Sequence, residues 1–139
     1  VDVSPLQSLA KQEFTERCLK GEEVSPDQML CEPGVFKEFY VPTVTTADIE
    51  KWTCNFSFTV EDADCFHGFV TWFDVGFPKP EEGEAVTLTT SPHSKLTHWK
   101  HDVFLLDEPM SLKTDKVISG VIKVEQNDDW KRHYNVEFA

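Results

Sequence analysis

The sequence predicts a mainly β fold, an antiparallel β-barrel or sandwich preceded by a short helical lead-in. Apolar residues recur with helical spacing only near the start of the chain, and from Val35 onward they alternate with polar residues. Strand-like segments then follow one another at short intervals, separated by residues typical of turns. With 139 residues, the chain is long enough for one domain with a single core.

The helical lead-in is predicted to span residues 1–34. Within it, residues 6–20 place apolar side chains on one face of a helix, and Gly21 is expected to end that helix. A second, shorter helical turn is expected over residues 25–33, because Pro33 cannot continue a helix.

The β-barrel domain is predicted to span residues 35–139. Residues 53–60 alternate between apolar and polar side chains, which indicates a half-buried strand, whereas residues 66–77 are apolar on both faces, as in a central strand. The predicted strands are 35–41, 53–60, 66–77, 85–90, 101–107, 117–124 and 132–138. The 11 Phe residues fit this interpretation, because strands favour aromatic side chains for packing.

The charge balance excludes some classes of partner. The chain has 13 Lys and Arg against 25 Asp and Glu, for a formal net charge of -12. Such a surface repels phosphate backbones and anionic lipids, so we expect neither direct nucleic-acid binding nor membrane binding. The sequence shows no long apolar stretch and no basic leader, which predicts a soluble, intracellular protein.

The familiar motifs for cofactors, metals and nucleophiles are missing from the sequence. There is no glycine-rich phosphate loop, and the 4 cysteines lack the spacing of a zinc site or a redox pair, so we expect reduced thiols. His93, His98 and His101 cluster in sequence, but no thiol or carboxylate recurs at a spacing that would complete a metal site. We therefore expect no metal and no cofactor bound by this chain.

Thr97, His98 and Trp99 stand where a loop meets a predicted strand. In one interpretation Trp99 closes the end of the fold and His98 satisfies backbone carbonyls. In the other, both rings face a ligand, because an indole can flank a guanidinium and an imidazole can orient a carboxylate. Spacing alone leaves both interpretations open.

Three segments carry a family resemblance: WFDVGF at 72–77, TLTTSPHSKLTHWKHDVFLLDEP at 87–109 and ISGVIKV at 118–124. Together they resemble the C-terminal half of protein arginine N-methyltransferases, in which the THW loop is a named motif. The segment RCLKGEEVSPDQMLCEPGVFKEFYV at 17–41 is similar to the type I members, which form asymmetric dimethylarginine. The resemblance covers nearly the whole chain.

The resemblance implies that the chain is the substrate-binding β-barrel of an S-adenosylmethionine-dependent enzyme. The Rossmann domain, which in this family binds the methyl donor and carries two glutamates that grip the guanidinium, is absent from these residues. The chain alone is therefore expected to be inactive. Glu81 and Glu82 lie in a Pro-rich turn and are not expected to be that glutamate pair.

The resemblance also implies roles for the motif residues. His98 would hydrogen-bond toward an acidic residue elsewhere in the parent protein as a supporting residue, Trp99 would line the arginine channel, and Thr97 would hold the loop. The implied partners are basic, Arg-rich substrates such as histone tails, the Rossmann domain of the same protein and a second copy in a homodimer, in the nucleus or the cytoplasm. One departure is His101, where the family usually has Gln.

Two alternatives belong to other functional classes. The chain could be a non-catalytic barrel that only contacts other proteins. It could also be an unrelated β-sandwich that stacks sugars on Trp52, Trp72, Trp99 or Trp130.

Overall fold

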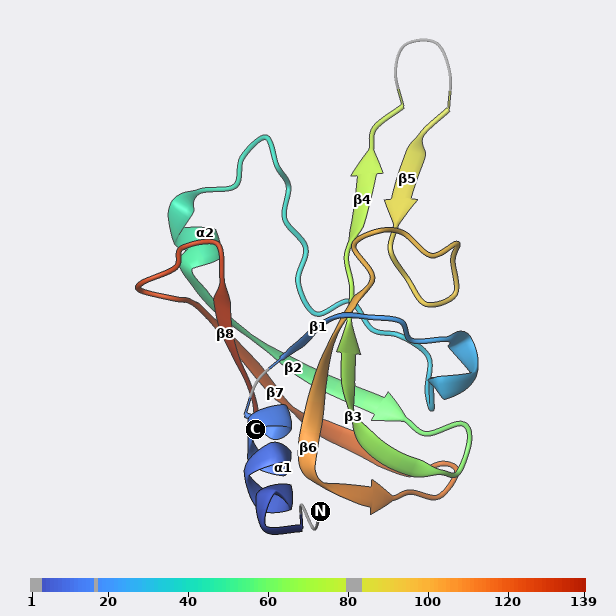
Figure 1. Ribbon diagram of the computed structural model, residues 1–139. Coiled ribbons are helices and arrows are strands. Elements are labelled where there is room, and N and C mark those ends of the chain that lie inside the picture. The colour runs from blue at the N-terminus through green and yellow to red at the C-terminus, as the bar shows by residue number, and fades with distance from the viewer. Residues whose placement is uncertain (1–3, 17, 80–83) are drawn as a thin grey trace. The chain divides into compact units, whose positions relative to one another are not determined.

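The computed structural model describes residues 4–16, 18–79 and 84–139, and these form antiparallel sheets with a helix near the N-terminus (Figure 1). The predicted mainly β class is therefore confirmed. The chain divides into two compact units, one made of Val1–Leu30 and Asp64–Leu112, the other of Cys31–Ala63 and Lys113–Ala139. We refer to them as the first and second unit.

The first unit holds most of the helices and strands, and it also contains the motif residues Thr97, His98 and Trp99. In chain order it contains η1 (Ser4–Leu6), α1 (Gln7–Thr15), β1 (Leu19–Glu22), η2 (Pro26–Gln28), β3 (Cys65–Thr71), β4 (Asp74–Phe77), β5 (Val86–Thr89) and β6 (His101–Ser111). Strand β6 lies between β1 and β3 in an antiparallel sheet, and β4 pairs with β5 in a separate hairpin (Figure 1). Helix α1 contacts β6.

The second unit is built on a three-stranded antiparallel sheet. It contains α2 (Thr46–Glu50), β2 (Lys51–Thr59), β7 (Val117–Gln126) and β8 (Tyr134–Phe138), with β7 between β2 and β8 (Figure 1). The burial of β2 alternates residue by residue, as predicted from its sequence. Its inner face stacks Phe56 on Phe58, with ring centroids 5.5 Å apart, and β7 contributes the buried Ile122 and Val124.

The helix predicted over residues 6–20 is too long at its C-terminal end. The α-helix ends at Thr15, and Leu19–Glu22 instead form β1, which pairs with the start of β6. Gly21, expected to stop the helix, lies in a bulge of β1 with φ of 74°, a left-handed conformation that glycine adopts without strain. Long-range strand pairing here overrides local helical periodicity.

The strand predicted over residues 35–41 is wrong. This segment has no strand structure; its side chains pack instead, with Phe36 stacked on Trp52 at 5.4 Å and Phe39 meeting the same indole edge-on at 6.4 Å. The backbone then turns, since the N–H groups of Thr43 and Val44 donate to the Tyr40 carbonyl. Aromatic stacking therefore holds this segment without ladder hydrogen bonds.

The single strand predicted over residues 66–77 is two strands. The first part, β3, pairs with β6, whereas β4 leaves that sheet and pairs with β5. The break falls at Trp72 and Phe73, where the Phe73 backbone bonds to Thr90 instead of continuing the ladder. The remaining predicted strands are confirmed within a few residues at their ends.

Two further predictions concern the short helical turn and the cysteines. The turn predicted over residues 25–33 is present as η2, and a capping box formed by Ser25 and Gln28 begins it. All four cysteines, Cys18, Cys31, Cys54 and Cys65, are free thiols. Within the described ranges, no helix has the length and apolar character needed to span a bilayer.

Candidate functional site

The three motif residues lie on the loop that joins β5 to β6. Its last part is a tight turn, closed by a hydrogen bond of 3.2 Å from the Lys100 N–H to the Thr97 carbonyl. Lys100 has φ of 54°, which is unusual for a residue other than glycine and lets the chain enter β6 directly after the turn. We call Thr97–Lys100 the THW turn.

Trp99 is held by contact and still open to solvent. Its indole is 47% exposed and packs edge-to-face on Phe73, with ring centroids 5.6 Å apart and planes at 80°. Phe73 is fixed in turn by Thr90, which is 3% exposed. The Thr90 hydroxyl accepts a hydrogen bond from the Phe73 N–H at 3.1 Å and donates one to the Phe73 carbonyl at 2.8 Å. The indole is therefore braced on one side and accessible on the other.

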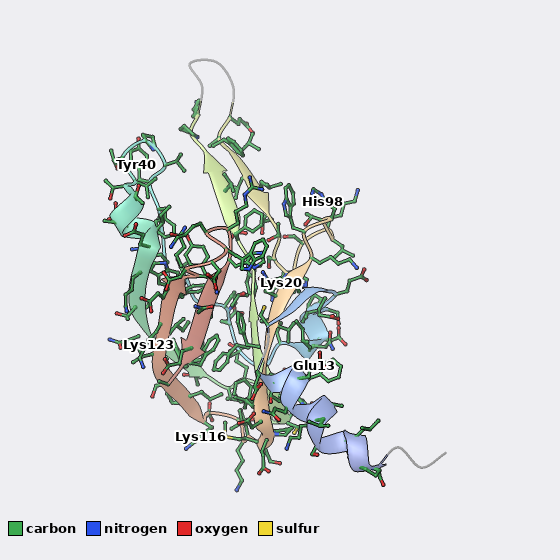
Figure 2. The ribbon with its side chains drawn as sticks, turned by 60° about the vertical axis from the view of Figure 1, so that its left-hand side comes forward. Glu13, Lys20, Tyr40, His98, Lys116 and Lys123 are labelled. Atoms are coloured by element: carbon green, nitrogen blue, oxygen red, sulfur yellow. The ribbon has the colours of Figure 1, made fainter. Side chains whose placement is uncertain are left out.

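His98 is exposed at the outer side of the loop (Figure 2). Its ring lies 3.9 Å from the Trp99 ring between centroids, tilted by 33°. No hydrogen bond of its imidazole to another described residue is present, so both ring nitrogens can serve a partner outside these residues. Neither His98 nor Trp99 is sealed in a core.

Thr97 carries a buried polar atom without a partner. Its hydroxyl oxygen is shielded from solvent and makes no hydrogen bond with any described residue. A buried hydroxyl usually has a partner, because leaving it unpaired costs about 1–3 kcal/mol. Thr97 braces the turn through its backbone carbonyl, which accepts from the Lys100 N–H.

The end of the THW turn is tied to the segment that follows β1. Lys100 Nζ lies 3.0 Å from the Glu23 carboxylate, and His101 Nδ1 accepts a hydrogen bond from the Val24 N–H at 3.1 Å. His101 is 2% exposed and is the first residue of the strand predicted over residues 101–107. It lines a pocket of about 340 Å³ together with Glu23, Gln28 and Ser94, among others.

One thiol near the start of β6 has a raised pKa. Burial and, after it, the adjacent Asp102 carboxylate together raise the pKa of Cys18 from 9.0 to about 11, while Lys20 opposes this rise. The thiolate, which is the reactive form, is therefore disfavoured at neutral pH. Cys18 is unsuited to nucleophilic chemistry.

The other sequence-predicted candidates are dispersed or lie outside the description. His93 and His98 are exposed while His101 is buried, and no group of three or more potential metal ligands occurs in the described parts of the chain. Glu81 and Glu82 lie outside the described residues. Sequence reasoning did not identify Phe73, Thr90 or Val24, which support the turn from distant positions.

Comparison with known proteins identifies the family. A family model described as "Arginine methyltransferase oligomerization subdomain" matches residues 1–139, the entire chain. The chain belongs to the arginine methyltransferase family. An unrelated sugar-binding β-sandwich is thereby ruled out.

Relatives within the arginine methyltransferase family include protein arginine N-methyltransferase 2 of two organisms. The chain is 37% identical over 139 residues to protein arginine N-methyltransferase 2 of Xenopus tropicalis, covering 100% of this chain, and 32% identical to the Homo sapiens protein of the same name, covering 99%. It spans 32% of the length of each of these relatives. The chain therefore corresponds to about a third of such a methyltransferase.

Solved structures of the family share the fold. A heterotetrameric complex of Trypanosoma brucei PRMT1 enzyme and prozyme with AdoHcy matches with a TM-score of 0.80 at 24% identity, over 100% of this chain and 43% of that chain. Arabidopsis thaliana protein arginine methyltransferase 10 matches with a TM-score of 0.83 at 23% identity, over 99% of this chain and 42% of that chain. At these identities the comparison supports the fold alone.

Proposed function

We propose that the chain is the substrate-side β-barrel of a type I, S-adenosylmethionine-dependent protein arginine N-methyltransferase. Its THW turn would form one wall of the channel that receives the substrate arginine. The observation that carries this proposal is the presentation of Trp99, which is braced by Phe73 yet 47% exposed. A rigid, half-exposed indole can flank a guanidinium by cation–π contact and planar stacking.

His98 and Thr97 fit supporting roles in the same channel. The exposed imidazole of His98 lies against Trp99, where it can orient a carboxylate supplied by another part of the parent protein. Thr97 would hold the turn through its backbone carbonyl, which accepts from the Lys100 N–H. These features support a site that is completed by residues beyond this chain.

The remainder of the parent protein would supply the methyl donor and the acid groups. S-adenosylmethionine provides a methyl group whose bond to sulfur breaks as a bond to a guanidine nitrogen forms, and that nitrogen then loses its proton. Residues of this chain would contribute orientation and exclude water, which are large terms when two reactants must be aligned. We place no acid, base or nucleophile of the reaction on this chain.

Charge supports a basic protein substrate. The net charge of -12 attracts Arg-rich segments such as histone tails and speeds their encounter with the enzyme. Apolar side chains of the first unit, such as Leu6 at 59% and Leu9 at 62% exposed, suit contact with the remainder of the parent protein or a second copy. We accordingly propose a homodimeric, intracellular enzyme with a separate Rossmann domain.

The test uses the full-length parent protein and an Arg-rich histone peptide. We expect Trp99→Ala and His98→Ala each to lower kcat/KM by at least about tenfold, since misplacing one reactant costs this much or more. Two matched controls are Trp130→Ala, a more exposed tryptophan of the second unit, and His93→Ala, an exposed histidine of the same loop. Both controls should retain full activity.

Mass spectrometry of the product separates the finer parts of the proposal. Asymmetric dimethylarginine would support type I, whereas a symmetric product would contradict it. Unchanged activity in Trp99→Ala would refute the role of the turn. Absence of methyl transfer in the wild-type parent protein, with intact binding of the peptide, would favour a non-catalytic interaction barrel.

A further inference from the structure

His101 is a polar side chain buried at the first position of β6. It is 2% exposed, and its Nδ1 accepts the hydrogen bond from the Val24 N–H. An imidazole nitrogen that accepts carries no proton, so the single proton of this ring lies on Nε2. The contact therefore requires the neutral form of His101.

The hydrogen bond replaces a lost rung of the β-sheet. The β1–β6 ladder is regular at Leu19 and Lys20, shifts at the bulge, and ends where Glu22 faces His101. Val24 lies two residues further along, beyond the last ladder pair. The His101 side chain satisfies its N–H there, which would otherwise lose its partner in a partly buried place.

This bond connects the THW turn to another segment of the first unit. Lys100 and His101, consecutive in sequence, contact Glu23 and Val24, which are also consecutive. The Lys100–Glu23 ion pair is exposed, at 38% and 60% of the two side chains, and pairs of that kind contribute little. The buried imidazole is therefore the specific part of the connection.

We propose that His101 is a positioning residue for the THW turn and that it acts only while neutral. Protonation places N–H groups on both ring nitrogens, so the imidazolium cannot accept from Val24. The connection would then fail, and the root of the turn would loosen. The consequence for methyl transfer rests on the proposed function, whereas the contact and its loss do not.

Charged residues near His101 come from two segments. Glu22 is the ladder partner of His101 and Glu23 follows it, while Lys100 and Asp102 flank His101 in sequence. Glu23 is the other ionisable residue among the described residues that line the adjacent pocket, and it is already paired with Lys100. The wall formed by Ser91 and Ser94 adds no titrating group. The imidazole of His101 is the group whose protonation would remove the hydrogen bond from the Val24 N–H.

The test measures hydrogen exchange of the Val24 amide in the full-length parent protein by mass spectrometry. Exchange is followed between about pH 8 and about pH 5 and corrected for the intrinsic rate at each pH. Peptides of β2 serve as the internal reference. We expect wild-type protection of Val24 to fall at least about tenfold on acidification, as a lost buried hydrogen bond implies.

Two variants distinguish proton sensitivity from simple packing. His101→Gln can still accept through its amide oxygen and does not titrate, so it should protect Val24 equally at both ends of the pH range. His101→Phe fills the space without an acceptor, so it should leave Val24 poorly protected throughout. Protection that is independent of pH in the wild type, or that falls as steeply in His101→Gln, would overturn the proposal. The pH series on the wild-type protein needs no variant, so it tests the proposal even if His101→Gln or His101→Phe fails to fold.

Activity provides the second measurement. We expect kcat/KM of the wild type to decline on the acid side more steeply than that of His101→Gln. If kcat/KM declined equally on the acid side in the wild type and in His101→Gln, the positioning role would be refuted. If the parent protein transfers no methyl groups, the proposed function fails while the exchange result still decides the state of His101.

Discussion

Thr90 holds the peptide group on each side of Phe73: its hydroxyl accepts from the Phe73 N–H and donates to the Phe73 carbonyl, which also accepts from the Thr90 N–H at 3.2 Å. Both residues lie between regular strands, where ladder hydrogen bonds end. The aromatic ring that supports Trp99 is thus placed by a buried hydroxyl. The position of the Trp99 indole therefore depends on Thr90, which acts on it through Phe73.

Removing that hydroxyl should both destabilise the first unit and release the indole. We expect Thr90→Val to lower the free energy of unfolding by about 1–3 kcal/mol, because it leaves the Phe73 N–H unpaired in a part-buried place. Denaturant titration measures this change in stability. In a background in which the other tryptophans are replaced, quenching of Trp99 fluorescence by an added solute should rise in Thr90→Val. The control is Thr87→Val on exposed β5 surface, which should change neither. Equal stability of the two variants would contradict the prediction.

Gly68 should tolerate no side chain. A Cβ at this position would lie 2.0 Å from the Phe104 carbonyl oxygen, in the bulge where β3 shifts register against β6. Backbone on β6 would have to move, so we expect Gly68→Ala to lower the free energy of unfolding by about 3 kcal/mol or more.

The matched control for this prediction is another strand glycine. A Cβ at Gly76 on β4 would meet nothing within 4 Å, so Gly76→Ala should be neutral or slightly stabilising. Thermal unfolding of both variants makes the comparison. Similar melting temperatures for the two would show that the bulge can relax around an added methyl group.

Thr97→Val should be tolerated. The buried hydroxyl has no partner among the described residues, so replacing it by a methyl group should leave the free energy of unfolding unchanged or raise it by about 1 kcal/mol. In the parent protein, kcat/KM should stay near the wild-type value, because the substitution keeps the backbone carbonyl that closes the turn. A loss of stability in Thr97→Val would mean that the hydroxyl is bonded within the chain.

The thiol of Cys18 should react slowly at neutral pH. Its pKa is raised to about 11 by burial and then by Asp102, so its alkylation rate should keep rising well above pH 9.0. Asp102→Asn should lower this pKa in part, because burial remains, whereas Lys20→Met should raise it. Mass spectrometry of the Cys18 peptide after timed alkylation gives the rates.

The same shift predicts a loss of stability in alkali. Since the folded pKa lies above that of the unfolded thiol, the folded state holds the proton more tightly. Its stabilising contribution is complete below about pH 9 and is lost as the pH rises toward about 11. Cys18→Ala should remove this part of the pH dependence, and a titration by denaturant at each pH checks it.

The sequence predicts a strand well where one face of that strand is buried, because the alternation of apolar and polar residues then shows the strand without knowledge of its pairing partner. Residues 53–60 show the clearest alternation, and β2 has that burial pattern along its length. Strand β1 was missed because four residues around Gly21 carry no alternation and pair with residues about eighty positions away. The break between β3 and β4 has no glycine or proline to announce it and depends on Thr90.

The candidate site also divides into residues that local sequence identifies and residues that only the fold brings together. Thr97, His98 and Trp99 could be named from the motif, because a family resemblance reports local sequence. Their supports could not, since Phe73, Thr90 and Val24 become neighbours of the turn only through folding. Local chemistry is readable from a short segment, whereas its bracing depends on tertiary contacts.

The β4–β5 hairpin begins one residue after Phe73, so the two are mechanically continuous. A change in the path of β4 would displace the Phe73 ring without altering any residue of the THW turn. The Phe73 ring that supports Trp99 therefore depends on where β4 begins, in addition to its hydrogen bonds with Thr90.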